Sequence, residues 1–284
     1  LKQRTTKLTR QEKQAWLHGF ALGDASLYIV KSEITLTTPR IDTMLAFATI
    51  ASEFSRVVRA YPGIKKRNLT PTWYLHAETT PQEIAKMIEI RKTVNLTPYT
   101  NDIKLLSALT AGIIDSDGTI ALSIKRRTRG GKQKYYFEPE VHITNTNTKL
   151  LQTLKTAWLR YGIVFKERIA MKKGSIGKGG IMRLSDVRRI RIESQHQISQ
   201  LLKHILPYMQ HIERIAKATI TIAYTDGKIP HDPTLIQKAA NTLRTYYEQY
   251  LRYQSQKLIL KLYQQRKQIK INKNGTITLA PIKR

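Results

Sequence analysis

Two glycine-containing apolar segments constrain this chain more than any other feature of its sequence. The first, WLHGFALGDASL, covers residues 16–27, and the second, LSALTAGIIDSDGTIA, covers residues 106–121. Gly112 follows Gly19 by 93 residues (112 − 19), and the remaining positions align with the same offset. A glycine inside a helix costs about 1 kcal/mol relative to alanine, so a repeated glycine requires a packing reason. We therefore interpret the chain as two copies of one unit, each built around a helix that packs closely against the other.

The charge of the chain indicates a polyanionic partner. Its 284 residues include 49 Lys and Arg but 20 Asp and Glu, a formal net charge of +29. Such an excess repels itself unless a polyanion neutralises it. Double-stranded DNA or another nucleic acid is the expected partner, and an anionic membrane surface is the weaker alternative. The absence of cysteine excludes disulfides and thiolate metal sites.

Composition also bounds the class of protein. A hydrophobic content of 41% is sufficient for two compact domains. The sequence contains neither an apolar run long enough to span a bilayer nor a recognisable signal peptide. We therefore expect a soluble, intracellular protein without a membrane partner, located in the cytoplasm or in an organelle matrix.

The first copy, residues 1–97, alternates between helical and strand-like patterns. Thr9 and Glu12 form a potential capping box at the start of a helix. The sequence periodicity predicts a helix at 10–23, a hairpin within 26–37, a helix at 41–55, a hairpin from 57–61 and 72–78, and a helix at 81–91. Trp73 and Leu75 are expected to face the core.

The second copy, residues 102–229, repeats this order after a linker at about 93–102. The pattern predicts a helix at 103–117, strands at 119–127 and 136–144, a helix at 147–161, strands at 163–171 and 181–186, and helices at 194–206 and 208–224. A basic C-terminal extension, residues 230–284, has no counterpart in the first copy. We expect it to form a helix over 234–268 and a small hairpin that turns at Asn274-Gly275.

The repeated order of helix, hairpin, helix, hairpin and helix predicts an α+β fold. Each half would contain an antiparallel four-stranded sheet with one polar face and helices on the other. The two pseudo-symmetric halves would together form a saddle of sheets, with the motif helices at the interface and the C-terminal helical extension beside them. Because one chain supplies both halves, we expect a monomer.

Outward-facing, mostly polar side chains on the predicted strands, together with the basic loops between them, form the expected DNA-binding surface. A β-ribbon fits the major groove, and such side chains contact base edges and phosphates. In the first copy they are Ser26, Tyr28, Val30, Ser32, Thr35, Thr37, Arg40, Arg59, Tyr61, Lys65, Lys66, Arg67, Thr72, Tyr74 and His76. In the second copy they are Thr119, Ala121, Ser123, Lys125, Arg127, Arg129, Lys132, Lys134, Tyr136, Glu138, Glu140, His142, Lys166, Arg168, Lys172, Arg183 and Ser185.

Asp24 and Asp117 end the two motif helices, again 93 residues apart (117 − 24). A carboxylate there meets the negative end of the helix dipole, and two neighbouring carboxylates repel each other. A divalent cation between them would relieve both effects, and hard oxygen ligands favour Mg²⁺ completed by water and substrate phosphate. These residues therefore indicate metal-dependent chemistry at a phosphate. Asp115 is interpreted as a structural partner or helix-end cap.

These segments resemble the signature of the LAGLIDADG homing endonucleases. TAGIIDSDG at 110–118 matches the nine-residue signature at most positions, and LHGFALGDA at 17–25 matches it more loosely. The resemblance covers roughly residues 10–226. It implies a pseudo-dimer in one chain that cleaves both strands of a long asymmetric DNA site, in the service of intron homing, and leaves short 3′ overhangs.

The resemblance also implies a metal site. Asp24 and Asp117 would be the catalytic, metal-binding pair, and the main-chain carbonyls of Gly23 and Ser116 would join the metal shell. Mg²⁺ is the implied cofactor, with Mn²⁺ able to substitute and Ca²⁺ expected to bind without supporting cleavage.

Further catalytic candidates follow from the same resemblance. The family often places a polar residue at the end of the second strand to order water, and Asn145 and Thr38 match that position. It also often has a lysine near the start of the helix that closes each half. No lysine falls there in the second half of this sequence, where His211 and Arg214 are the nearest candidates.

Three functions are compatible with this sequence. The first is a site-specific DNA endonuclease, and the second is a maturase that binds intron RNA on the same scaffold. The third is a DNA-binding regulator on a degenerate version of the fold, and the intact acids of both motifs argue against it. The acids do not separate the first two functions.

Overall fold

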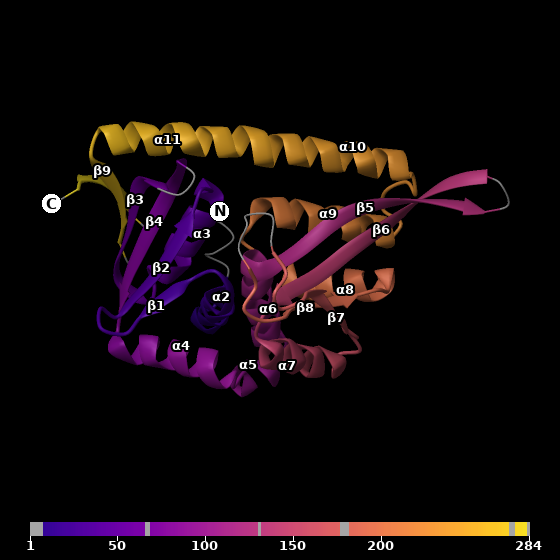
Figure 1. Ribbon diagram of the computed structural model, residues 1–284, viewed down its shortest axis with the longest axis horizontal. Helices are drawn as coiled ribbons and strands as arrows, with labels where there is room; N and C mark the ends of the chain where they lie inside the picture. Colours follow the sequence, from indigo (N-terminus) through magenta and orange to yellow (C-terminus); the bar gives the residue numbers. More distant parts are fainter. Residues whose placement is uncertain (1–7, 66–68, 130–131, 177–181, 273–275, 283–284) are drawn as a thin grey trace.

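The two motif helices lie together at the centre of the molecule, between two β-sheets (Figure 1). The computed structural model describes residues 8–65, 69–129, 132–176, 182–272 and 276–282, apart from the side chains of Arg129 and Glu248. Helix α2 (Arg10–Gly23) begins at the predicted capping box, in which the Thr9 hydroxyl accepts from the Glu12 backbone N–H. Helix α6 (Ile103–Asp117) begins at Asp102, whose carboxylate accepts from two backbone N–H groups.

Gly19 and Gly112 allow these helices to approach until their backbones touch. A Cβ atom on Gly19 would lie 2.0 Å from the carbonyl oxygen of Leu109, and one on Gly112 would lie 2.1 Å from that of Trp16. Leu109 follows Trp16 by the same 93 residues that separate the glycines. The contacts are therefore related by pseudo-two-fold symmetry, which confirms the packing role predicted for the repeated glycines.

The first half contains strands β1 (Ser26–Tyr28), β2 (Glu33–Thr38), β3 (Ser55–Lys65) and β4 (Thr70–Thr79), with helices α3 (Ile41–Ala51) and α4 (Pro81–Thr93). Its sheet has six strands rather than the predicted four, in the order β1-β2-β4-β3-β9-β10. The two additional strands are the C-terminal hairpin, β9 (Lys267–Ile271) and β10 (Ile277–Pro281). Ile271 pairs with Val58 and Ile269 pairs with Ala60, so buried side chains of β9 continue the apolar face of the sheet.

The first hairpin is shorter than the alternating pattern predicts. Ser32 adopts a positive φ of 48° and its backbone N–H donates to the Ile29 carbonyl, so the chain turns between Tyr28 and Glu33. Val30 and Ser32 consequently lie in this turn and not on a strand, and the side chain of Val30 is fully exposed.

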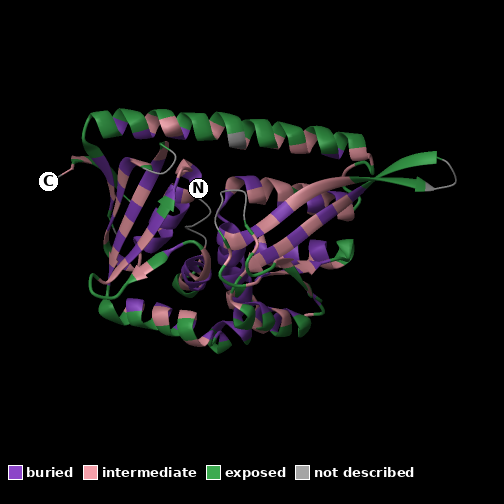
Figure 2. Ribbon diagram, in the orientation of Figure 1, coloured by how far each residue is buried: buried purple, intermediate pink, exposed green. Residues whose placement is uncertain are grey.

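The second half contains β5 (Gly118–Arg129), β6 (Lys132–Asn145), β7 (Lys166–Met171) and β8 (Val187–Ile192), with α7 (Thr148–Leu159), α8 (Gln195–Ile205) and α9 (Ile212–Thr225). Its antiparallel sheet has the predicted four strands, in the order β5-β6-β8-β7. The side chains of Ile120, Val141 and Ile143 face the core. A continuous hydrophobic core joins both halves, and Figure 2 shows its buried residues along the motif helices and the strands.

The prediction of a strand at 181–186 is wrong. The strand in this position is β8, whose Val-Arg-Arg-Ile-Arg-Ile sequence pairs Ile190 with Ile143 and Ile192 with Val141. Arg183 and Ser185 precede β8 in an irregular connection, where the Asp186 carboxylate accepts from the Lys173 backbone N–H. The β-branched residues of 187–192 can bury one face against β6, whereas the polar end of 181–186 cannot.

The last helix of the second half starts at Ile212 rather than at the predicted residue 208. The cause is the buried carboxylate of Asp115, which accepts hydrogen bonds from the backbone N–H groups of Gln210 (2.7 Å) and His211 (3.4 Å). These bonds hold the chain outside the helical conformation just before α9.

The C-terminal extension crosses from the second half to the first as one long helix, which we call the strap (Figure 1). It consists of α10 (Pro233–Arg244), the π-helix η1 (Thr245–Leu251) and α11 (Arg252–Gln264). The helix therefore ends four residues before the predicted residue 268, where β9 takes over. The expected turn at Asn274-Gly275 lies outside the described residues, although the strands that it would join pair as predicted.

The linker between the halves contains a one-turn helix, α5 (Thr97–Thr100). None of the described helices combines the length and the apolar composition needed to cross a membrane.

Candidate active site and nucleic-acid interface

Asp24 and Asp117 lie at the adjoining C-terminal ends of α2 and α6. Asp24 is the C-cap of α2, and Asp117 is the last residue of α6. A Cβ atom on Gly23 would lie 3.0 Å from the carboxyl carbon of Asp117 and 2.3 Å from the Ser116 hydroxyl. A carboxylate from each half therefore reaches the same small region at the end of the helix crossing.

The pKa values of both carboxyls are raised, as expected for two neighbouring acids without a cation between them. Burial raises the pKa of Asp117 to about 6, and repulsion by Asp24 adds to the increase. Burial also raises the pKa of Asp24, although its side chain reaches solvent and the positive charge of Arg214 acts in the opposite direction. A divalent cation bound between the two carboxylates would offset both effects.

The two aspartates would need further oxygen ligands to hold a metal ion. In the described part of the chain, no cluster of three or more His, Asp or Glu side chains could hold one alone. Mg²⁺ commonly uses one or two carboxylates and completes its shell with water and substrate phosphate, so these residues fit such an ion. The carbonyl oxygen of Ser116 accepts a 3.3 Å hydrogen bond from Arg214 Nη2, which occupies part of its capacity as a ligand.

An arginine caps the C-terminal end of each motif helix. Arg214, from the first turn of α9, donates to the carbonyl oxygens of Ile114 and Ser116. Arg91, from the last turn of α4, donates to those of Ala21 and, at 2.7 Å, Ala25. Ile114 follows Ala21 by 93 residues, so one acceptor of each arginine occupies the same position of the repeat (114 − 21).

Sequence reasoning identified Arg214 and missed Arg91. The two arginines come from non-equivalent positions of the repeat, so alignment of the halves could not pair them. Each charge also acts across the interface, because Arg214 lowers the pKa of Asp24 and Arg91 lowers the pKa of Asp117. The sequence feature that could have identified Arg91 is its place as a basic residue in the last turn of α4.

Asn145 and Thr38 differ in what they contact. Asn145 ends β6 and its side-chain amide donates a 2.7 Å hydrogen bond to the Asp117 carboxylate. Thr38 ends β2 at the corresponding place, but its hydroxyl accepts from the backbone N–H of Arg40. Among the described residues, Thr38 has no hydrogen bond with Asp24.

His211 and Asp115 belong to the structural support of the site. His211 precedes α9 and is buried, and its Nδ1 atom has no hydrogen-bond partner among the described residues. Burial, followed by the nearby charges of Arg214 and Arg40, lowers its pKa well below the usual value. Asp115 accepts from the indole of Trp16 at 3.0 Å as well as from the start of α9, which confirms its role as a structural partner.

The polar face predicted for β5 and β6 is present in the second half. The strand register places Thr119 opposite His142, Ser123 opposite Glu138 and Lys125 opposite Tyr136. Ala121, Arg127, Lys134 and Glu140 lie on the same face by this register. Lys132 pairs with Arg129, whose side chain is not described.

Strand β8 extends this face with two arginines that sequence reasoning missed. Arg191 pairs with His142 and Lys166, and Arg189 pairs with Thr144 and Arg168. The misplacement of the strand hid both arginines. Burial and the neighbouring charge of Arg189 lower the pKa of His142 to about 4, so this imidazole is neutral at pH 7.

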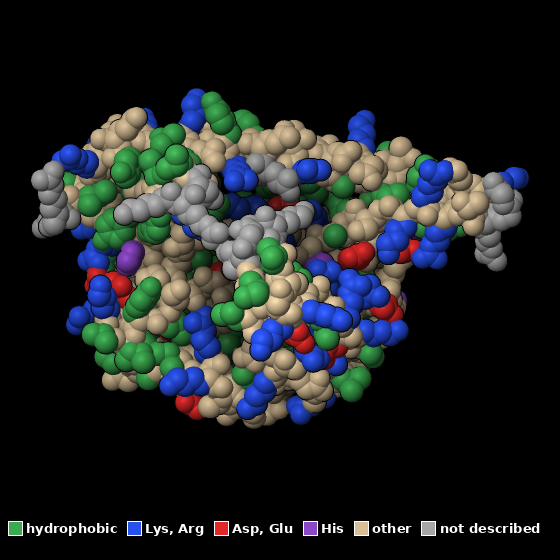
Figure 3. Space-filling model, viewed as in Figure 1, with side chains coloured by type: hydrophobic (Ala, Val, Ile, Leu, Met, Phe, Trp, Pro, Cys, Tyr) green, Lys and Arg blue, Asp and Glu red, His purple; other side chains and the backbone are tan. Residues whose placement is uncertain are grey.

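Acidic side chains moderate the positive charge of this face. Lys125 lies 2.8 Å from Glu138 and 3.8 Å from Glu140, and Arg127 also pairs with Glu138. Figure 3 shows Lys and Arg side chains gathered over the second half, with acidic groups among them. Exposed pairs of this kind contribute about 0–1 kcal/mol each, so phosphates can displace them readily.

The first half presents a comparable but less charged face. Thr35, His76 and Arg59 lie in one row across β2, β4 and β3, with Ser26 beside Thr35. Thr37, Tyr74 and Tyr61 form the next row. Lys65 ends β3 and Tyr28 ends β1, while Lys66 and Arg67 lie outside the described residues.

Three further residues predicted for the DNA-binding surface do not lie on an exposed strand face. Thr72 is buried rather than exposed, because it pairs with Gly63 and the ring of Tyr74 covers that glycine. Arg40 donates to Asp42 and Glu213 and thereby joins the two halves. Lys172 follows β7 in the irregular connection that also contains Arg183 and Ser185.

Comparison with protein families finds one match, within the second half. Residues 105–205 match the model of the LAGLIDADG-like domain. A comparison with curated proteins finds no match.

Several solved structures are similar to this chain. Full-length DUF199/WhiA from Thermatoga maritima is 15% identical, with 84% of this chain and 68% of that chain covered and a TM-score of 0.49. I-DmoI, solved in complex with DNA and Ca, is 14% identical over 70% of this chain and 91% of that chain, with a TM-score of 0.44. The homing endonuclease I-CvuI, in complex with its target in the presence of Ca, is 17% identical over 56% of this chain and 96% of that chain, with a TM-score of 0.36.

The matched residues include α6, its two aspartates and the four-stranded sheet that follows, and the first half repeats this arrangement around α2. Residues 105–205 of this chain thus match the LAGLIDADG-like domain, and the chain has the two-motif α+β fold in which a pair of motif helices joins two halves.

Proposed function

We propose that this protein is a site-specific double-strand DNA endonuclease that hydrolyses phosphodiester bonds with a divalent metal ion. The observation that carries the proposal is the convergence of Asp24 and Asp117 at the ends of two helices in backbone contact. Each carboxylate there bears an unfavourable charge that a bound cation would stabilise. A single chain supplies both halves, so the active form would be a monomer suited to intron homing.

Asp24 and Asp117 would hold Mg²⁺, and the main-chain carbonyls of Gly23 and Ser116 are candidates to complete the protein ligands. When bound, such an ion polarises a phosphate oxygen and lowers the pKa of a coordinated water. The hydrogen bond from Asn145 orients Asp117. Arg91 and Arg214 offset the negative ends of the helix dipoles at which the aspartates lie.

The two polar sheet faces would bind the DNA on either side of this site. The row of Arg189, Arg191, Lys166 and Arg168 offers phosphate contacts, and β5 and β6 offer side chains for base edges. I-DmoI and I-CvuI were solved with DNA, which supports the same type of partner for this chain.

Cleavage of a randomised duplex library tests the proposal. We expect one long site to be cut with Mg²⁺ or Mn²⁺, to be bound without cleavage in Ca²⁺, and to yield short 3′ overhangs when the ends are sequenced. Asp24→Asn and Asp117→Asn should abolish cutting while they retain binding. Asp102→Asn, at the exposed N-cap of α6, is a matched control that should cut normally, because asparagine also caps helices. Absence of cutting with either metal, despite tight binding to duplex DNA, would refute the endonuclease.

A further inference from the structure

The middle of the strap, residues 237–254, has one half-buried face and one exposed face. Ala239, Ala240, Leu243, Tyr247 and Leu251 are half-buried, and their spacing of three and four places them on the first of these faces. At one end Ile236 is buried against Phe137 and Tyr224, and at the other end Ile259 and Leu262 are buried against the first half. Between these anchors, from 237 to 254, no described side chain is buried (Figure 2). The opposite face of the helix is exposed and carries mainly polar side chains, so it is available for a partner.

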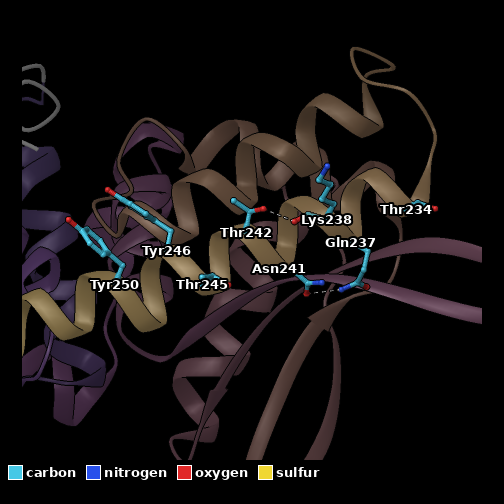
Figure 4. Close-up of a pocket in the computed structure, with 8 residues that line it drawn as sticks. All are labelled: Thr234, Gln237, Lys238, Asn241, Thr242, Thr245, Tyr246 and Tyr250. Atoms are coloured by element: carbon cyan, nitrogen blue, oxygen red, sulfur yellow. Dashed lines mark hydrogen bonds between the residues drawn. The ribbon is translucent and has the colours of Figure 1, made fainter.

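The exposed face of residues 237–254, together with Thr234, lines a pocket of about 810 Å³. Its residues recur at intervals of three and four, which places them on one side of the helix. Figure 4 shows Tyr246 and Tyr250 projecting side by side, with Lys238, Gln237 and Asn241 along the same stretch. The amide of Gln237 donates to that of Asn241 at 3.1 Å.

The tyrosines are held in a way that suits stacking. The rings of Tyr246 and Tyr250 are stacked, with centroids 5.7 Å apart and planes inclined by 21°. They are 49% and 53% exposed, so their outer faces are open to solvent. The π-helix η1 contains both residues, and such irregular turns occur frequently at functional sites.

The side chains on this face indicate which kind of partner it can bind. Open aromatic rings stack on unpaired bases, and amide side chains bond to base edges. The strap carries five Lys and Arg (238, 244, 252, 257 and 261) against one acid (248), so an anionic strand is favoured. Paired bases of a duplex are not available for stacking on side chains. Thr242 and Thr245 add hydroxyl groups that can exchange hydrogen bonds with the 2′-hydroxyl of a ribose.

From these observations we propose that the strap binds single-stranded RNA, with Tyr246 and Tyr250 as the stacking platform. This site is separate from the sheet faces and does not rest on the proposed endonuclease.

Fluorescence anisotropy of the full-length protein with a labelled 12-nucleotide RNA of mixed sequence tests this proposal, with Ca²⁺ present and unlabelled duplex DNA in excess to occupy the sheet faces. Stacking is worth about 1–3 kcal/mol per base, so Tyr246→Leu/Tyr250→Leu should weaken RNA binding by roughly tenfold or more. Tyr263→Leu removes a tyrosine of the same helix that is equally exposed, at 49%, but lies outside the pocket, and it should bind RNA as the wild type does.

Two further measurements make the result specific. Duplex binding by Tyr246→Leu/Tyr250→Leu should be unchanged, which shows that the variant is folded. A 4-thiouridine RNA should crosslink to the peptide that contains residues 237–250. Equal affinity for a DNA 12-mer of the same sequence, an equal loss in Tyr263→Leu, or crosslinks confined to the sheets would overturn the proposal.

Discussion

Asn145 donates a hydrogen bond to the Asp117 carboxylate, whereas Thr38, at the corresponding strand end, makes no such bond to Asp24 within the described structure. Both side chains nevertheless share a second contact. Asn145 Oδ1 accepts from the Asn147 backbone N–H at 2.8 Å, and Thr38 Oγ1 accepts from that of Arg40 at 3.2 Å. The longer amide reaches the carboxylate while it retains the local turn, and the hydroxyl does not.

This asymmetry predicts that one DNA strand depends on Asn145. Asn145→Ala removes the bond that orients Asp117 and that opposes the rise in its pKa. We expect cleavage of one strand to slow by roughly tenfold, the loss typical of a positioning contact near a metal ligand. Thr38→Ala should leave both rates nearly unchanged. A duplex of the target labelled at both 5′ ends measures the two rates, and an equal decrease for both strands in Asn145→Ala would contradict the prediction.

The raised pKa of Asp117 predicts a measurable effect on stability. Its folded value of about 6 exceeds the unfolded value near 3.8, so the folded state binds the proton more tightly. The metal-free protein therefore loses stability as the pH rises from about 4 to about 6, and the loss persists above that range. At pH 7.5, Asp117→Asn should raise Tm by about 2–4 °C, after allowance for partial exposure.

Calorimetry at two pH values and with metal checks this expectation. The gain of Asp117→Asn should vanish at pH 3.5, where the wild-type carboxyl is protonated in both states. Mg²⁺ should raise Tm of the wild type and have less effect on the variant. A variant less stable than the wild type at pH 7.5 would show that Asp117 has a counter-charge in the metal-free protein.

At the helix crossing we expect replacement of glycine by alanine to destabilise the protein, the reverse of its usual effect inside a helix. Gly→Ala inside a helix normally stabilises by about 1 kcal/mol. At Gly19 or Gly112 the added Cβ would overlap a backbone carbonyl of the other helix, at 2.0 and 2.1 Å. Each variant should therefore lose about 1–3 kcal/mol or more in urea unfolding, as overpacked cores do. Unchanged or increased stability in both variants would mean that the helices can separate without loss.

We expect substitution of either capping arginine to reduce cleavage, although Arg91 and Arg214 occupy non-equivalent positions of the repeat. Arg91→Met removes the donor to the carbonyls of Ala21 in α2 and Ala25 just after it, and Arg214→Met removes the donor to Ile114 and Ser116 in α6. Both should reduce cleavage by at least tenfold. Mg²⁺ affinity should not decrease, because each change removes a positive charge that acts on the two aspartates, so the loss of cleavage would reflect the lost caps rather than lost metal. Arg160→Met, which removes an exposed arginine that donates to Asn101 near the opposite end of α6, is the control. Normal cleavage by either capping variant would refute its role.

Much of the fold follows from local patterns in the sequence. The capping box at Thr9, the cap at Asp102 and the repeated glycines each act through neighbours in the chain or through a symmetric copy. The alternation of β5 and β6 gave the correct face for each side chain because one face of the pair is buried.

The remaining features depend on contacts that no local pattern records. The start of α9 is set by the Asp115 carboxylate, about 95 residues earlier in the chain. Strand β8 was misplaced because the apolar residues of 181–184 resemble a strand until the partners in β6 are known. Arg91 escaped notice because it performs the task of Arg214 from a helix in a different position of its half.

Pairing of β9 with β3 has a consequence for biosynthesis. Ile271 lies beside Val58, which precedes it by 213 residues (271 − 58). A ribosome therefore releases β1 to β4 long before β9, the strand that covers the β3 edge. Until then the edge presents unpaired backbone groups, which favour association with other chains. The first half therefore depends on strands from the C-terminal extension, and its sheet reaches its final form only after β9 and β10 have been synthesised.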